Sequence, residues 1–209
     1  MNRLLFIGID TFSALLILLP VILIFKFTFF RQYSIKRTTL IGLFALYLSA
    51  VFSATGIPDV NSLTPDFSFN LIPFIDMAND PAGYLKNSLL NILLFVPFGF
   101  LLPAVWRDYR TLKKTAFAGF ALSLAIEILQ IFTFRLTDVD DLITNTAGAL
   151  AGYFLAKTCL GKVWQRPLES EEQTYGKYEP IVIFAVVLFL MFFIHPSVSH
   201  VLYRFYNFS

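Results

Sequence analysis

The chain has 209 residues, of which 57% are hydrophobic and 14% are charged, and its formal net charge is +2. This composition excludes a water-soluble globular domain, and basic residues spread thinly along the chain exclude a nucleic-acid-binding protein. The single cysteine, Cys159, excludes an intramolecular disulfide and a Cys-x-x-Cys metal site. The composition therefore predicts an all-α integral membrane protein with one membrane domain over residues 1–209.

Six apolar runs are each close to the roughly 20 residues that a helix needs to cross a bilayer. We expect transmembrane helices at about residues 4–25, 39–56, 86–104, 115–134, 139–157 and 180–200. The first run is too long for the core of a cleavable signal peptide, so it is predicted to be retained. The sequence thus predicts a bundle of about six spans.

The orientation of these spans follows from the distribution of lysine and arginine. Twelve of the 16 basic residues lie in the connections after the first, third and fifth spans, and four lie on the opposite side. Those four are Arg3, Lys86, Arg135 and Arg204. Because basic connections stay in the cytoplasm, both termini are predicted to be outside.

The connection and helix start between residues 135 and 148 concentrate polar side chains beside two apolar runs. Spacings of three and four residues place one set of side chains on a single face of the fifth span, while Asp140 points away from that face. The set is Asp138, Asp141, Asn145, Gly148 and Gly152. The two glycines are expected to let a neighbouring helix approach closely.

Polar residues at a matching depth occur on the third and fourth spans. Asn91 lies near the outer end of the third span, and Glu127 and Gln130 lie near the outer end of the fourth. We therefore expect spans three, four and five to pack around a polar pocket open to the outer surface. The predicted pocket residues are Asn91, Glu127, Gln130, Arg135, Asp138, Asp141 and Asn145.

Four motifs in this order and spacing resemble the VanZ-like family. They are Asn70-Leu-Ile-Pro-Phe74, Asn91-Ile-Leu-Leu-Phe-Val-Pro-Phe-Gly99, Glu127-Ile-Leu-Gln130 and Asp138-Val-Asp-Asp141-Leu-Ile-Thr-Asn145-Thr-Ala-Gly148. The resemblance covers about residues 40–158, or spans two to five, and leaves 180–200 as an additional C-terminal span. It implies a multi-pass protein of the bacterial cell membrane, in a family whose namesake is associated with low-level resistance to the lipoglycopeptide teicoplanin.

The family's signature polar positions correspond to predicted pocket residues. They fall on Asn91, Glu127, Gln130, Asp138, Asp141 and Asn145, with Arg135 where many members have a basic residue. We hypothesise that the pocket binds the polar part of an amphiphile, which is a membrane lipid, a lipid-linked wall precursor or a lipoglycopeptide. Arg135 would pair with its phosphate or carboxylate.

Two alternatives remain open. In the first, the polar residues only form a hydrogen-bonded network that holds three helices together. In the second, the protein is an intramembrane enzyme with Glu127 as acid and Asp138 or Asp141 as base, or with a divalent ion held by these three and Asn145. The sequence contains no nucleophile elbow, zinc motif or phosphate loop, so it favours a protein that is not an enzyme. No cofactor or resident metal is predicted.

Overall fold

The computed structural model describes residues 3–28, 31, 33–65, 67–133, 137–164 and 178–205. Its elements are α1 (Arg3–Thr28), α2 (Ile35–Thr55), β1 (Phe69–Asn70), α3 (Ile75–Asn79), α4 (Pro81–Val105), the 3-10 helix η1 (Arg107–Tyr109), α5 (Leu112–Gln130), β2 (Thr137–Asp138), α6 (Val139–Trp164), α7 (Glu179–Phe189), the π-helix η3 (Leu190–Ile194) and α8 (His195–Phe205). The last three elements follow one another without a break. Each predicted span is helical over most of its range, which confirms the all-α class.

Four of these helices are long and apolar enough to cross a membrane. They are Ile9–Thr28, Ile35–Thr55, Pro81–Val105 and Glu179–Phe205, found in a search of the described residues. Helices α5 and α6 are not among them; α5 carries three charged residues, Lys113, Lys114 and Glu127, and α6 includes Asp140, Asp141 and Asn145. The chain is therefore a membrane protein by this measure, while six spans and outward termini stay predictions.

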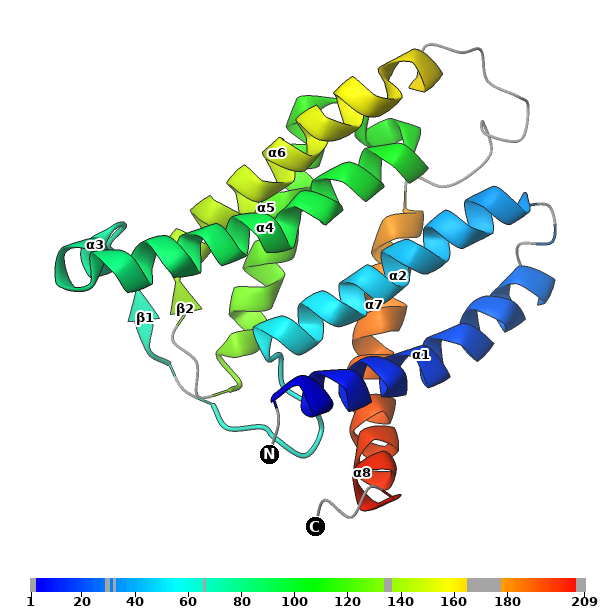
Figure 1. Ribbon diagram of the computed structural model, residues 1–209, viewed down its shortest axis with the longest axis horizontal. Coiled ribbons are helices and arrows are strands. Elements are labelled where there is room, and N and C mark those ends of the chain that lie inside the picture. The colour runs from blue at the N-terminus through cyan, green and yellow to red at the C-terminus, as the bar shows by residue number, and fades with distance from the viewer. Residues whose placement is uncertain are drawn as a thin grey trace. The chain divides into compact units, whose positions relative to one another are not determined.

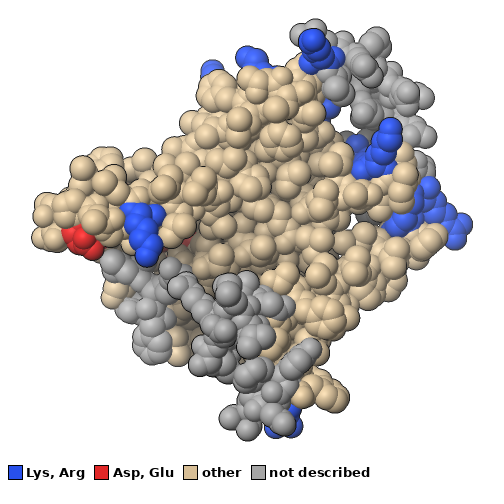
Figure 2. Space-filling model, viewed as in Figure 1, with Lys and Arg blue, Asp and Glu red and all other residues tan. Residues whose placement is uncertain are grey.

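The surfaces of the helices also suit a membrane. Large apolar side chains are exposed on them, for example Leu23 on α1, Phe117 on α5 and Phe154 on α6. On the face shown in Figure 2, most of the surface of the described residues carries neither acidic nor basic side chains. In water so much exposed apolar area would favour aggregation, whereas lipid chains solvate it.

Local sequence explains where several helices begin and end. Ser34 accepts a hydrogen bond from the backbone N–H of Arg37 (3.3 Å) and so caps the start of α2, and Gly56 ends that helix in the left-handed conformation at φ 64°. Asp80 caps α4 by accepting the N–H of Gly83 (3.0 Å), and Pro81 occupies the first turn.

The chain folds as two compact units, which we describe separately. The polar-cluster unit, residues 64–169, contains α3 to α6 with β1 and β2. Here α6 runs alongside α4, α5 packs against α6, and the two short strands pair in parallel with Asn70 opposite Asp138 (Figure 1). Its core includes the buried side chains of Phe95, Leu102 and Ile126.

The cavity unit consists of residues 1–63 and 170–209 and contains α1, α2 and the helix formed by α7, η3 and α8. Helix α1 packs against α2 and α8, and α2 packs against α7 (Figure 1). The rings of Phe52 on α2 and Phe184 on α7 meet edge to face at 5.5 Å. The buried core between these helices is therefore aromatic and aliphatic.

Candidate functional site

Close packing between α4 and α6 sets the geometry of the candidate site. A Cβ atom added at Gly148 would overlap the carbonyl group of Ile92, and one added at Gly152 would overlap the carbonyl oxygen of Val96. The backbones of the two helices therefore touch where α6 has glycine, as predicted from the spacing of these residues. This contact brings the start of α6 beside Asn91 of α4.

Asp141 and Asn91 form the polar tie between these two helices. The Asn91 side-chain amide donates to the Asp141 carboxylate at 2.6 Å. Asp141 lies in the first turn of α6, where the unpaired N–H groups and the helix dipole favour a negative charge. The two predicted residues are thus brought together, and the carboxylate is held by a charge-assisted hydrogen bond.

Asn145 makes the corresponding tie between α6 and α5. Its side chain is 4% exposed, and its Nδ2 donates to the hydroxyl oxygen of Ser123 at 2.9 Å. The Ser123 hydroxyl in turn donates to the backbone oxygen of Asp141 at 3.4 Å. The Oδ1 atom of Asn145 is buried and has no hydrogen-bond donor among the described residues. An amide oxygen in this state costs about 1–3 kcal/mol, so it is poised to accept a hydrogen bond.

Glu127 lies near the end of α5 with 2% of its side chain exposed. Its Oε2 atom accepts the backbone N–H of Asp138 at 3.0 Å, and its backbone oxygen accepts the hydroxyl of Thr137 at 3.4 Å. These bonds fix β2 against α5 and offset part of the cost of burying the carboxylate. Gln130, one turn later, is also buried, at the same end of α5.

The structure places Asp138 outside the helix to which its spacing had assigned it. It lies in β2, and its carboxylate accepts the N–H of Asp140 at 2.9 Å, which caps the start of α6, and the side-chain amide of Asn70 at 3.3 Å. Burial, with the nearby Asp140 and Asp76 carboxylates, raises the pKa of Asp138, although its hydrogen bonds oppose the shift.

Asp140 has a role that its helical phase does not reveal. It does point away from the face of Asp141 and Asn145, but it is 5% exposed and is not an ordinary helix-start residue. Both of its carboxylate oxygens accept the backbone N–H of Phe74, at 3.0 and 3.2 Å. Phe74 has a φ of 64°, which is unfavourable for a residue with a Cβ, and this pair of contacts stabilises the turn.

Hydrogen bonds join these side chains in two groups, one around Asp138 and one around Asp141, and we call them together the polar cluster. Its members are Asn70, Asn91, Ser123, Glu127, Asp138, Asp140, Asp141 and Asn145. The predicted pocket did not include Asn70, Ser123 and Asp140. The available signal was the motif from Asn70 to Phe74, because it stands before α4 with a polar residue at its start and a proline before its end.

Two further predictions concern a divalent-ion site and the position of Arg135. A divalent ion held by Glu127, Asp138, Asp141 and Asn145 has no support, because no three His, Cys, Asp or Glu side chains of the described residues lie close enough to hold a metal. The three carboxylates accept hydrogen bonds from different elements: Asp141 from α4, Glu127 from β2 and Asp138 from β1. Arg135 lies outside the described residues, so its place at the site stays a prediction.

The chain is similar to known proteins over most of its length. The family model described as VanZ/LLP1 matches residues 12–161, a range that includes every member of the polar cluster. Protein VanZ of Enterococcus faecium is 32% identical over 139 residues, which cover 64% of this chain and 76% of that protein. No solved structure matches the chain. On the extent of the family match and the identity to VanZ, this chain belongs to the VanZ/LLP1 family.

Proposed function

We propose that the protein is a multi-pass protein of the bacterial cell membrane that binds the polar part of an amphiphilic envelope molecule at the polar cluster. A lipoglycopeptide such as teicoplanin and a lipid-linked wall precursor both combine sugar hydroxyls and amines with a hydrocarbon chain. The family relationship supports a role in teicoplanin resistance. Carboxylates and amides of the cluster suit hydroxyl and amine donors, while the surrounding apolar helices suit the hydrocarbon chain.

The observation that carries this proposal is the buried Oδ1 atom of Asn145. A network that served only to join helices would gain by supplying this oxygen with a donor, since leaving it without one costs free energy. A ligand hydroxyl or amine that reaches between α5 and α6 would satisfy it. Ser123, which accepts a hydrogen bond from the same Asn145 amide, would then lie beside the ligand group.

The test compares teicoplanin and vancomycin susceptibility of a bacterial strain that lacks the protein with the same strain expressing variants. We expect the wild-type chain to lower teicoplanin susceptibility, and Asn145→Leu and Glu127→Gln to lose this effect at unchanged membrane levels of protein. Asp108→Ala is the matched control, because it removes a half-exposed carboxylate of the same unit away from the cluster. If loss of the effect always accompanies loss of folded protein, the cluster is only structural.

The proposed topology has six spans with both termini and the start of α6 outside. It rests on the predicted positive-inside orientation and on the helical structure of all six ranges. In a Cys159→Ser background, an impermeant thiol reagent added to intact cells should label Leu63→Cys and should not label Lys113→Cys, both of which are exposed positions. Labelling of Lys113→Cys but not of Leu63→Cys would mean that the protein has the opposite orientation.

A further inference from the structure

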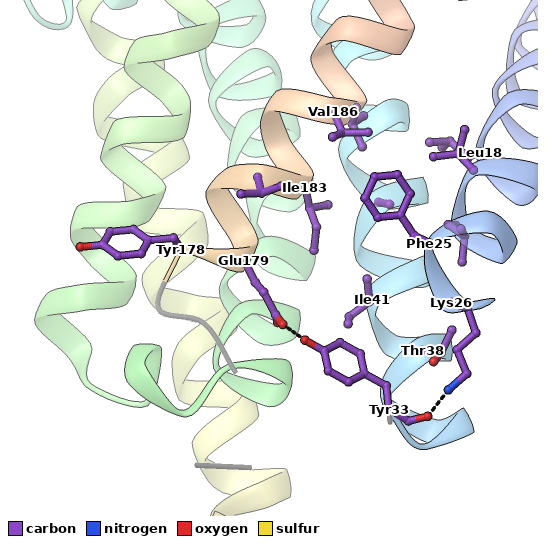
Figure 3. Close-up of a pocket in the computed structure, with 15 residues that line it drawn as sticks. Leu18, Phe25, Lys26, Tyr33, Thr38, Ile41, Tyr178, Glu179, Ile183 and Val186 are labelled. Atoms are coloured by element: carbon purple, nitrogen blue, oxygen red, sulfur yellow. Dashed lines mark hydrogen bonds between the residues drawn. The ribbon is translucent and has the colours of Figure 1, made fainter. Parts of the chain in front are cut away.

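The cavity unit contains a hollow between α1, α2 and α7 that the polar cluster does not involve. Its volume is about 310 Å³, near the lower end of the range of about 300–1,000 Å³ that ligand pockets cover. Figure 3 shows Leu18 and Phe25 of α1, Ile41 of α2, and Ile183 and Val186 of α7 around it. The lining is almost entirely apolar, so the hollow suits a hydrocarbon.

One end of this cavity is polar. Lys26 donates to the backbone oxygen of Tyr33, and the Tyr33 hydroxyl donates to Glu179 at the start of α7 (Figure 3). Arg37 forms an ion pair with the same carboxylate at 2.8 Å, and its guanidinium lies 4.8 Å from the centre of the Tyr33 ring. The cavity therefore has an apolar interior and one charged edge, which is the distribution of polarity along a lipid molecule.

Among the residues that the structure describes, basic groups outnumber acidic ones at this edge. Residues 26–37 contain Lys26, Arg31, Lys36 and Arg37 and no acidic residue, while α7 contributes Glu179. Arg37 pairs with that carboxylate, and of the other three basic residues Lys26 lines the cavity. Such an edge attracts anionic headgroups more strongly than zwitterionic ones.

We propose that the cavity holds one acyl chain of an anionic membrane phospholipid, with the phosphate beside Lys26. A second protein helix is excluded as the occupant, because a helix with its side chains is about 10–12 Å across and needs more room than 310 Å³ provides. An unbranched chain fits a narrow hollow lined by aliphatic groups. This inference does not depend on the function proposed for the polar cluster.

The first experiment tests the acyl-chain site. The purified full-length protein in detergent is titrated with phosphatidylglycerol, and bound lipid is counted by native mass spectrometry. Val186→Phe narrows the cavity and should weaken binding by about tenfold or more, because the room for one methylene in a hydrophobic pocket is already worth about tenfold in affinity. Ala185→Phe is the control, since Ala185 is exposed on the same helix and does not line the cavity. Equal binding by a folded Val186→Phe variant would overturn the proposal.

The second experiment tests the headgroup and does not depend on the first variant folding. Wild-type protein should bind phosphatidylglycerol several-fold more tightly than phosphatidylcholine, and Lys26→Gln should abolish this preference. Lys36→Gln makes the same change in net charge, but Lys36 is exposed and does not line the cavity, so the preference should persist. Equal binding of the two lipids by the wild-type protein, or equal effects of the two lysine variants, would refute the assigned headgroup position.

Discussion

The two units bury polar side chains in different ways. In the cavity unit the buried serines bond to their own helices: Ser13 donates to Ile9 O at 2.8 Å, and Ser199 donates to Pro196 O at 3.1 Å. In the polar-cluster unit, the side chains of Glu127 and Asn145 bond to other elements of the fold.

The two kinds of hydrogen bond differ in whether they determine which elements pack together. A hydroxyl that bonds to its own helix is satisfied wherever that helix goes, so it does not select a neighbour. A carboxylate that binds the backbone of another element is satisfied in only one arrangement, so it fixes that arrangement. We therefore expect substitutions in the polar-cluster unit to cost more than equivalent ones in the cavity unit.

The largest effect should come from the α4–α6 contact. Gly152→Ala places a methyl group against the Val96 carbonyl and should lower the free energy of unfolding by about 3 kcal/mol or more, because two helix backbones must separate. Gly161→Ala is the matched control in the same helix: nothing lies within 4 Å of the added Cβ, and alanine favours helix by about 1 kcal/mol. Unfolding in mixed micelles with increasing SDS should therefore show shifts of opposite sign, and shifts of the same sign would contradict this packing.

The next largest effect concerns the buried carboxylate. Glu127→Ala leaves the Asp138 N–H without its acceptor and should cost about 2–3 kcal/mol in the same unfolding measurement. Glu127→Gln keeps an acceptor oxygen and should recover part of the loss. Ser13→Ala in the cavity unit, also a fully buried polar position, should cost less than about 0.5 kcal/mol. Similar costs for Glu127→Ala and Ser13→Ala would remove the distinction between the units.

A smaller effect isolates one tie between helices. Asn91→Ala and Asp141→Ala, alone and combined, form a double-mutant cycle across the 2.6 Å hydrogen bond between α4 and α6. We expect a coupling of about 1.5–2 kcal/mol, typical of hydrogen bonds to charged groups. Asn91→Ala combined with Asp108→Ala should show no coupling, because Asp108 lies in η1 at the other end of α4. Strict additivity for Asn91 and Asp141 would mean that the bond contributes nothing to stability.

The sequence predicted the helices and one packing face because both are periodic along the chain. Spacings of three and four correctly placed Gly148 and Gly152 toward a neighbouring helix and put Asp140 off that face. Periodicity says nothing about which distant segment meets a side chain. The bond from Asp140 to Phe74 joins residues 66 positions apart, and the parallel pairing of β1 with β2 joins two-residue strands too short to show alternation.

The same limit explains the other differences. Asp138 continues the helical spacing in sequence, yet it takes the capping position before α6, because its carboxylate can bond to the Asp140 N–H only from outside the helix. The cavity in the other unit arises from how side chains of three helices fill space together. The sequence of one helix does not show how it packs against two others, so composition predicted membrane helices there without predicting a binding site.

The smallest effect, and the most specific to the polar-cluster unit, is the response of Asp138 to pH. Burial raises its pKa above the ordinary value of 3.8, so folding favours the protonated form. Its contribution to stability is then complete below the ordinary pKa and is lost as pH rises through the folded pKa.

Asp138→Asn removes this dependence while keeping an acceptor for the Asp140 N–H. The thermal stability of wild type minus that of Asp138→Asn should therefore rise as pH falls from about 7 toward 4. Titrating groups shared by the two proteins, including Asp140 and Asp76, largely cancel in that difference, so a flat or opposite slope would mean that Asp138 is ionised as easily in the folded protein as in water.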